Sequence, residues 1–335
     1  MTAAAPLMRE AELEPLRARA LAILAGLDRI VLGQQALTRL VLSGMLSGGH
    51  VLLEGLPGLG KTELVKALAA LSGLDHKRIQ FTPDLLPSDI TGTTILQEVA
   101  GGARQLLFRP GPIFAQIVLA DEINRASPKT QSALLQAMQE HCVTVLDTTH
   151  VLPEPFFVLA TQNPVELDGT YPLPEAQLDR FALKATVTGV STATLTAILR
   201  DRPDGRAAPP APVCDAAGIR DLLAAVRRIA LPEAVAQYIA RLVNATRPEQ
   251  PDSPAVVKAQ VRWGASPRAA IALAGSARAS AFLAGRPAVG FADVKALAGA
   301  VLGHRVVLGY EAGLAGTSAS TLIAELVAQI PELSA

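Results

Sequence analysis

Residues 55–62 read Gly-Leu-Pro-Gly-Leu-Gly-Lys-Thr. This spacing is that of a phosphate-binding loop, in which glycines allow backbone N–H groups to approach phosphate oxygens closely. In such a loop the lysine ammonium contacts the β- and γ-phosphates and the threonine hydroxyl binds Mg²⁺, so Lys61 and Thr62 are the candidates for these roles. The residues expected to line the nucleotide are Gly55, Leu56, Pro57, Gly58, Leu59, Gly60, Lys61, Thr62 and Glu63.

The flanks of the loop match the context that the motif requires. Residues 50–54, His-Val-Leu-Leu-Glu, form a short apolar run typical of a strand, and residues 63–70 are rich in alanine and leucine, as helices are. Strand, glycine loop and helix in this order favour a nucleotide site over a chance glycine-rich turn.

Length and composition bound the class of protein. The chain has 335 residues, enough for two domains, and 50% of them are hydrophobic. Charged residues interrupt every apolar stretch before the roughly 18 residues of a membrane-spanning helix, so no span is expected. Glu10, Glu12 and Glu14 do not fit a secretory signal, and Cys142 and Cys214 have neither disulfide-framework nor metal-ligand spacing. These features indicate a cytoplasmic protein.

The charge balance bears on nucleic-acid binding. Thirty basic and thirty acidic side chains give a net charge of zero and are interspersed along the chain. Proteins that track nucleic acid usually carry a basic excess, so no nucleic-acid partner is expected, although a local basic pore would not show in the total.

Apolar runs alternate with helical stretches in the first two thirds of the chain. Residues 50–54, 117–120 and 156–160 have the composition of buried strands, and residues 127–139 that of a helix opened by Ser127 and Pro128. This alternation predicts an α/β fold, a phosphate-loop NTPase core with a parallel sheet and helices on both faces.

Two β-hairpins and a second domain complete the predicted organisation. The hairpins are expected over residues 93–108 and 143–151. The core with its N-terminal helices is assigned to residues 1–200, a proline-rich linker to 201–214 and a smaller all-α domain to 215–335.

Polar side chains follow two of the predicted strands directly. Asp121 and Glu122 come after residues 117–120, and Asn163 comes after 156–160. The carboxyl ends of parallel strands share one edge, so these residues should converge with the phosphate loop. An aspartate there can hold Mg²⁺ through water, while the glutamate and the asparagine can activate and place the attacking water. The alternatives are solvated loop acids and an asparagine that caps a turn.

Phosphoryl transfer places negative charge on the equatorial phosphate oxygens, so further cations are expected at the site. Arg180, in Leu-Asp-Arg-Phe, and Arg268, in Ala-Ser-Pro-Arg, are candidates. Position in the sequence alone does not single them out, because most arginines are solvated or salt-bridged surface residues.

Together these motifs resemble those of the AAA+ ATPases, and within them the MoxR family. The resemblance covers roughly residues 16–312, and the combination of motifs is more specific than the phosphate loop alone. The segments that carry it are Gly-His-Val-Leu-Leu-Glu-Gly (49–55) with the phosphate loop, Phe-Arg-Pro-Gly-Pro-Ile-Phe (108–114), Ala-Asp-Glu-Ile-Asn-Arg-Ala (120–126), Leu-Ala-Thr-Gln-Asn-Pro (159–164), Tyr-Pro-Leu-Pro-Glu-Ala-Gln-Leu-Asp-Arg-Phe (171–181) and Gly-Ala-Ser-Pro-Arg-Ala (264–269).

The resemblance implies a role for each candidate. Asp121 and Glu122 correspond to the Walker B pair, and Asn163 to sensor 1. Arg180 corresponds to the arginine finger, which reaches the nucleotide of a neighbouring subunit. Arg268 corresponds to sensor 2, expected to reach from the helical lid to the γ-phosphate of its own subunit. Val31 and Gly33 match the segment that lines the adenine pocket, and the two hairpins match elements that face a ring pore.

The resemblance also implies an activity and partners. MoxR-like proteins are regarded as ATP- and Mg²⁺-dependent chaperones that act on a client protein, often by metal-cofactor insertion and with a partner that carries a von Willebrand factor A domain. A homo-oligomer, in the form of a hexameric ring, is expected. The alternatives are a nucleic-acid motor, a metal-chelatase ATPase subunit and a nucleotide-gated binding module that rarely hydrolyses ATP.

Overall fold

The computed structural model describes residues 8–55, 60–98, 104–163, 170–202, 207–314 and 316–333. Its centre is a five-stranded sheet in which every neighbouring pair is parallel, in the order β2-β5-β8-β1-β9. The strands are β1 (Val51–Glu54), β2 (His76–Gln80), β5 (Ile117–Asp121), β8 (Phe157–Gln162) and β9 (Leu183–Thr186). The predicted parallel sheet is confirmed, and its two edge strands, β2 and β9, are additions that the sequence analysis did not predict.

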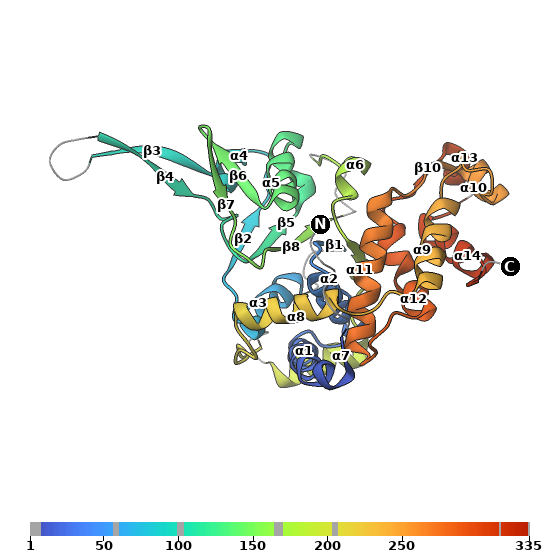
Figure 1. The fold of residues 1–335 in the computed structure, drawn as a ribbon. Helices are drawn as coiled ribbons and strands as arrows, with labels where there is room; N and C mark the ends of the chain where they lie inside the picture. Colours follow the sequence, from blue (N-terminus) through green and yellow to red (C-terminus); the bar gives the residue numbers. More distant parts are fainter. Residues whose placement is uncertain are drawn as a thin grey trace.

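Alternate residues of the central strands face two separate apolar cores. In β1, Val51 and Leu53 join the core formed with α1, α2 and α3, whereas Leu52 joins the core formed with α5. Side chains of a strand alternate between its two faces, so this pattern places helices on both faces of the sheet (Figure 1). The helices of this part are α1 (Glu10–Ile30), α2 (Gln35–Leu46), α3 (Lys61–Ser72), α4 (Pro87–Thr91), α5 (Pro128–Glu140), α6 (Glu175–Leu178) and α7 (Thr192–Asp201), with a short 3₁₀ turn, η1 (Ile123–Arg125).

The C-terminal part of the chain is helical and packs beside the sheet (Figure 1). Its helices are α8 (Ala216–Arg227), α9 (Glu233–Ala245), α10 (Ala255–Gln260), α11 (Pro267–Leu283), α12 (Phe291–Leu302), α13 (Tyr310–Leu314) and α14 (Ala319–Gln329). A short antiparallel pair, β10 (Val261–Trp263) and β11 (Val307–Leu308), interrupts the expected all-α pattern.

Helix α11 contacts α1 and α2, and α12 contacts β9. The apolar cluster on this side runs without interruption from α1 to α14. The division of the chain at residues 200 and 215 therefore stays a prediction.

Two antiparallel hairpins leave the body of the molecule, as the sequence predicted. One is formed by β3 (Gly92–Glu98) and β4 (Arg104–Pro110), and the other by β6 (Cys142–Val145) and β7 (Thr148–Val151). Figure 1 shows the β3/β4 hairpin extending well beyond the sheet and its helices.

Part of the predicted linker lies on the N-terminal helices. Residues 207–213 have no helix or strand, and the Val213 N–H donates to the carbonyl of Leu71 in α3 at 2.7 Å. Just before them, the Arg202 guanidinium donates to the carbonyls of Arg29 and Ile30 at the end of α1. Among the helices so described, none combines the length and apolarity needed to cross a bilayer.

Candidate functional site

The residues predicted to bind the phosphates and metal lie at one edge of the sheet. Strand β8 pairs in parallel with both β1 and β5, so Gly55, Asp121 and Asn163 stand at the carboxyl ends of three adjacent strands. Leu56, Pro57, Gly58 and Leu59 lie outside the described residues. The strand ends therefore converge as predicted. The individual side chains decide which ligand this place can bind.

Lys61 is the first residue of α3 and follows Gly60, whose φ of +80° is a left-handed conformation that suits glycine. Its ammonium donates to the carbonyl of Gly55 at 2.6 Å, across the loop. Burial lowers the pKa of Lys61, and the charges of Asp121 and Glu122 oppose this shift. Both acids are therefore close enough to act on the lysine, and this donor set fits a nucleotide phosphate with its Mg²⁺.

Thr62 and Glu63 occupy the first turn of α3, which continues directly from the loop. Both residues are partly buried, and Glu63 forms an i,i+3 ion pair with Lys66 at 3.1 Å. The position of Thr62, one residue after Lys61 at a helix N-terminus, is the one from which a hydroxyl reaches a phosphate-bound metal.

Thr161 of β8 links Asp121 and Glu122. Its hydroxyl donates to Asp121 Oδ1 at 2.6 Å and accepts from the Glu122 N–H at 2.8 Å, and the residue is fully buried. The other oxygen of Asp121 pairs with Arg78 of β2 at 2.7 Å. The aspartate is therefore fixed from the strands on both sides of β5.

Glu122 has a left-handed backbone, with φ 57° and ψ 49°. This region is costly for a residue with a side chain and is found preferentially at functional sites. Its Oε2 accepts hydrogen bonds from Gln80 at 2.9 Å and from Arg125 at 3.0 Å. The carboxylate of Glu122 is therefore held by Gln80 of β2 and by Arg125 of η1.

Asn163 follows β8 and is 5% exposed. Its backbone carbonyl accepts a hydrogen bond from Nδ2 of the Asn124 side chain at 3.1 Å. Its backbone N–H donates to Oδ1 of the same side chain at 3.4 Å. The backbone of Asn163 is therefore fixed to η1, immediately after Glu122.

The segment predicted to line the adenine pocket lies at this same edge. Gly33 has a φ of +74°, and a Cβ built on it would lie 2.7 Å from Thr194 Oγ1. The neighbouring Gln34 donates to the carbonyl of Thr188, just beyond β9, at 2.7 Å. A Cβ on Gly55 would lie 2.7 Å from the carbonyl oxygen of Val187. Residues 187–194 thus contact both the phosphate loop and the turn after Val31, which is buried.

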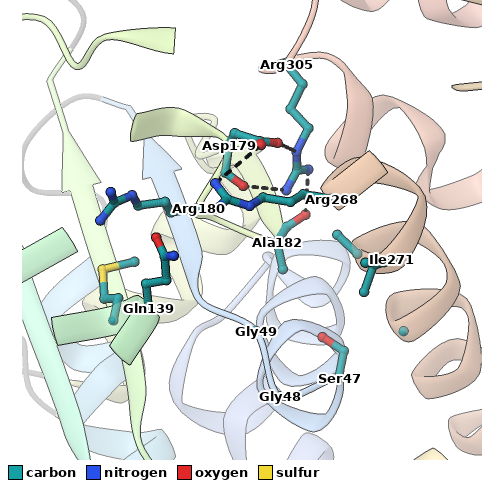
Figure 2. A pocket seen from close by; sticks show the side chains of 13 residues that line it. Ser47, Gly48, Gly49, Gln139, Asp179, Arg180, Ala182, Arg268, Ile271 and Arg305 are labelled. Atoms are coloured by element: carbon teal, nitrogen blue, oxygen red, sulfur yellow. Dashed lines mark hydrogen bonds and ion pairs between the residues drawn. The ribbon is translucent and has the colours of Figure 1, made fainter. Parts of the chain in front are cut away.

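Arg180 and Arg268 lie together (Figure 2). They lie at the end of the sheet where β1 and β9 begin, opposite to the carboxyl ends of the strands. Both line a cavity of about 260 Å³ whose walls include Ser47, Gly48 and Gly49, which precede β1. Arg180 itself precedes β9, which runs parallel to β1.

In this structure Arg268 lies away from the phosphate loop of its own chain, so its expected reach to that γ-phosphate stays a prediction. Its Nη1 lies 3.9 Å from Oδ2 of Asp179, a residue that precedes β9 in the chain. The phosphate loop starts only after the four residues of β1, a rise of about 13 Å. The physical reason is the packing of α11 on α1 and α2, which places the N-terminus of α11 at the edge where the strands begin.

Several residues of the site carry no recognisable signal in the sequence. Arg78 and Gln80 belong to a short, mostly exposed edge strand, and their contacts with Asp121 and Glu122 span more than 40 positions. Thr161 is part of the segment quoted for the resemblance, but only the pairing of β5 with β8 shows its role.

Comparison with known proteins identifies the family. Residues 50–183 match the model of the ATPase family associated with various cellular activities, and residues 254–326 match that of the AAA lid domain. The chain is 43% identical to the uncharacterized protein YeaC of Bacillus subtilis, over 91% of this chain and 92% of YeaC. It is 44% identical to Chaperone MoxR1 of Mycobacterium tuberculosis, over 85% and 74% of the two chains.

More distant relatives and a solved structure agree. Identity with protein MoxR of Paracoccus denitrificans is 32%, over 85% of this chain and 87% of that one. A crystal structure of a candidate ATPase from Cytophaga hutchinsonii superposes with a TM-score of 0.89 at 39% identity, covering 97% of this chain and 98% of that chain. The chain therefore belongs to the MoxR family of AAA+ ATPases.

Proposed function

We propose that this chain hydrolyses ATP at a site shared between two subunits of a ring, and that the energy remodels a client protein. The observation that carries the proposal is the separation of the site into two halves. Lys61, Asp121 and Glu122 stand at the carboxyl edge of the sheet, whereas Arg180 and Arg268 stand at the other edge. A subunit built in this way offers its arginines to a nucleotide that another subunit holds.

Each residue at the carboxyl edge has a role that its surroundings support. Lys61 and the loop N–H groups bind the phosphates, and Thr62 and Asp121 hold Mg²⁺, which would neutralise charge on the β- and γ-phosphates. Glu122 orients the attacking water and accepts its proton, while Asn163 helps to place that water. Val31 and Gly33 lie beside the loop, where the adenine would sit.

We expect phosphoryl transfer to need further cations besides those at the carboxyl ends of the strands. Charge grows on the equatorial oxygens of the γ-phosphate, and a guanidinium from a second subunit is suited to stabilise it. Arg180 is proposed as the finger in this role, and Arg268, which lines the same cavity, is proposed to act on the same neighbouring nucleotide. This differs from the role in its own subunit that the sequence resemblance implied.

The hairpins favour a polypeptide client over a nucleic acid. Among the described residues, the large hydrophobic side chains that the hairpins expose are aliphatic, and those more than half exposed are Leu96, Leu106, Leu146 and Val151. Arg104 and Arg109 of β4 are exposed beside them. Strand tracking on nucleic acid relies on cationic grooves together with aromatic platforms, and none of the large hydrophobic side chains that the described hairpin residues expose is aromatic. A hexameric ring, a cytoplasmic location and a von Willebrand factor A partner belong to the proposal through the family resemblance.

A mixing experiment tests the shared site. Glu122→Gln subunits and Arg180→Ala subunits are each expected to keep only a small residual activity, and ATPase activity is measured as the two are titrated against each other. Sites with an intact Glu122 facing an intact Arg180 arise only in mixed rings, so activity should return in proportion to them. Intact assemblies that show no recovery would exclude a finger acting between subunits.

A further inference from the structure

The segment that contains the proposed finger is bound mainly by the C-terminal helical part. Arg305, in the turn after α12, has a side chain that is 2% exposed. All five of its N–H groups are used, and four of them bind residues 179–182. Nε donates to Asp179 Oδ1 at 2.7 Å, and the two terminal nitrogens donate to the carbonyls of Asp179, Phe181, Ala182 and Val301.

The Asp179 carboxylate joins two separate parts of the lid. Its Oδ1 pairs with Arg305, after α12, and its Oδ2 accepts from the Ser266 hydroxyl at 2.9 Å, at the start of α11. Arg268, in the first turn of α11, lies 3.9 Å from the same oxygen. Figure 2 shows Arg305 and Arg268 converging on Asp179, beside Arg180.

Arg180 itself has little to hold it. Its Nε is buried and has no hydrogen-bond partner among the described residues. Its side chain lies between the cavity lined by Arg268 and a second one of about 280 Å³, lined by residues of α5. The position of the finger is therefore set by its backbone, and the residues on either side, Asp179 and Phe181, are the ones that the lid binds.

We propose that Asp179 is a positioning residue that transmits the angle of the lid to the Arg180 finger. This inference rests on the finger role proposed above. A lid movement that separated Arg305 from Asp179 would leave a buried charge unpaired, which proteins avoid. The segment therefore moves with α11 and the turn after α12, so the lid of one subunit sets how well its finger meets the neighbouring nucleotide.

A double-mutant cycle separates this role from a merely structural ion pair. In full-length protein, Asp179→Asn should lower kcat for ATP by about 10- to 100-fold, the effect expected when a positioned group moves by about 1 Å. KM for ATP should change less than about twofold, because the finger is proposed to act on charge that grows in the transition state and not on bound ATP. In an Arg180→Ala background, where the residual ATPase activity is measured at high protein concentration, Asp179→Asn should cause no further loss, since the group that it positions is gone.

The lid offers a matched control. Asp293 is 4% exposed, and its carboxylate pairs with Arg286 and accepts from the Ser280 hydroxyl, the same chemistry as Asp179 but without contact to residues 179–182. Asp293→Asn should lower the melting temperature with kcat falling less than about twofold. Ser266→Ala is a milder test that removes one bond to Asp179 and keeps its ion pair, and its smaller loss of kcat should also vanish in the Arg180→Ala background.

The outcomes distinguish the two levels of the proposal. If Arg180→Ala alone keeps full activity, the finger role is wrong. If Arg180→Ala loses nearly all of its kcat but Asp179→Asn keeps the parent's kcat, only the positioning role is wrong. It is also wrong if Asp179→Asn costs the same factor in both backgrounds, or if Asp293→Asn lowers kcat equally.

Discussion

The hydroxyl of Thr161 donates a 2.6 Å hydrogen bond to the carboxylate of Asp121, from the strand next to the one that Asp121 ends. The hydroxyl oxygen of Thr161 also accepts a hydrogen bond from the Glu122 N–H. One buried hydroxyl thus orients the proposed metal-binding acid and fixes the turn that carries the proposed catalytic base.

Replacing Thr161 by valine keeps the shape of the side chain and removes both bonds. The Glu122 N–H would lose its partner, at a cost of about 1–3 kcal/mol, and Asp121 could rotate. We expect kcat for ATP to fall by about 10- to 100-fold, as for other residues that orient metal-binding groups. Steady-state ATPase assays measure this, with Thr161→Ser as the control that keeps the hydroxyl. Equal kcat for the valine variant and the parent would contradict the role.

Gly55 stands where the phosphate loop leaves β1, and its Cβ would lie 2.7 Å from the backbone oxygen of Val187. Since a backbone oxygen cannot turn aside, Gly55→Ala should displace the loop and weaken ATP binding at least about tenfold. Binding of a fluorescent ATP analogue measures the affinity. Gly189→Ala is the matched control, because a Cβ there meets no atom of the described residues within 4 Å. Similar affinities for both variants would show that the close contact has no role in binding.

The grouping of Gly55, Asp121 and Asn163 at the carboxyl ends of adjacent strands could be predicted from the sequence because the signals are local. The phosphate loop is one continuous motif, and Asp121 and Asn163 directly follow strands whose apolar runs are unmistakable. Parallel strands then bring their carboxyl ends together wherever the sheet forms. Strand order adds the contacts of Arg78 and Thr161 with Asp121, which no local pattern shows.

The opposite edge could not be predicted in the same way. Its central ion pair joins Asp179 to Arg305 across 126 positions. The family resemblance identifies Arg268 as a candidate, but the end of the strands at which it lies depends on how α11 packs against α1 and α2. The edge strand β2 was also missed, because three of its five residues are exposed and its sequence has no apolar run.

Arg268 is expected to act on the neighbouring nucleotide, as Arg180 is. Mixing Arg268→Ala subunits with Glu122→Gln subunits should therefore restore ATPase activity, because some interfaces combine an intact Glu122 with an intact Arg268 from next door. If Arg268 served its own subunit, no site in the mixture would be complete. A mixture of Arg268→Ala with Arg180→Ala supplies the opposite control. If the neighbouring subunit supplies both arginines to a site, every site in this mixture lacks one of them and the mixture should stay inactive. Recovery of activity in this mixture would place Arg268 in the site of its own subunit.

His50 makes the stability of the fold dependent on pH. It is buried between β8 and α5, where its Nδ1 accepts from the Val158 N–H at 3.0 Å and its Nε2 lies 3.1 Å from the Met138 carbonyl. Because Nδ1 accepts a bond, Nε2 carries the proton and the ring is neutral. Burial lowers the pKa of His50 to about 4.

The sign of the effect follows from this lowered pKa. Between about pH 6.5 and pH 4 the unfolded chain binds a proton at His50 that the folded chain excludes, so stability falls as the pH falls through this window and is fully present above it. From pH 7 to pH 5, the parent should lose about 2 kcal/mol more than His50→Gln, at roughly 1.4 kcal/mol for each pH unit below 6.5. Denaturant unfolding at both pH values measures this, and His76→Gln, at an exposed position, is the control. An equal loss for the parent and His50→Gln would mean that His50 is not kept neutral by the fold.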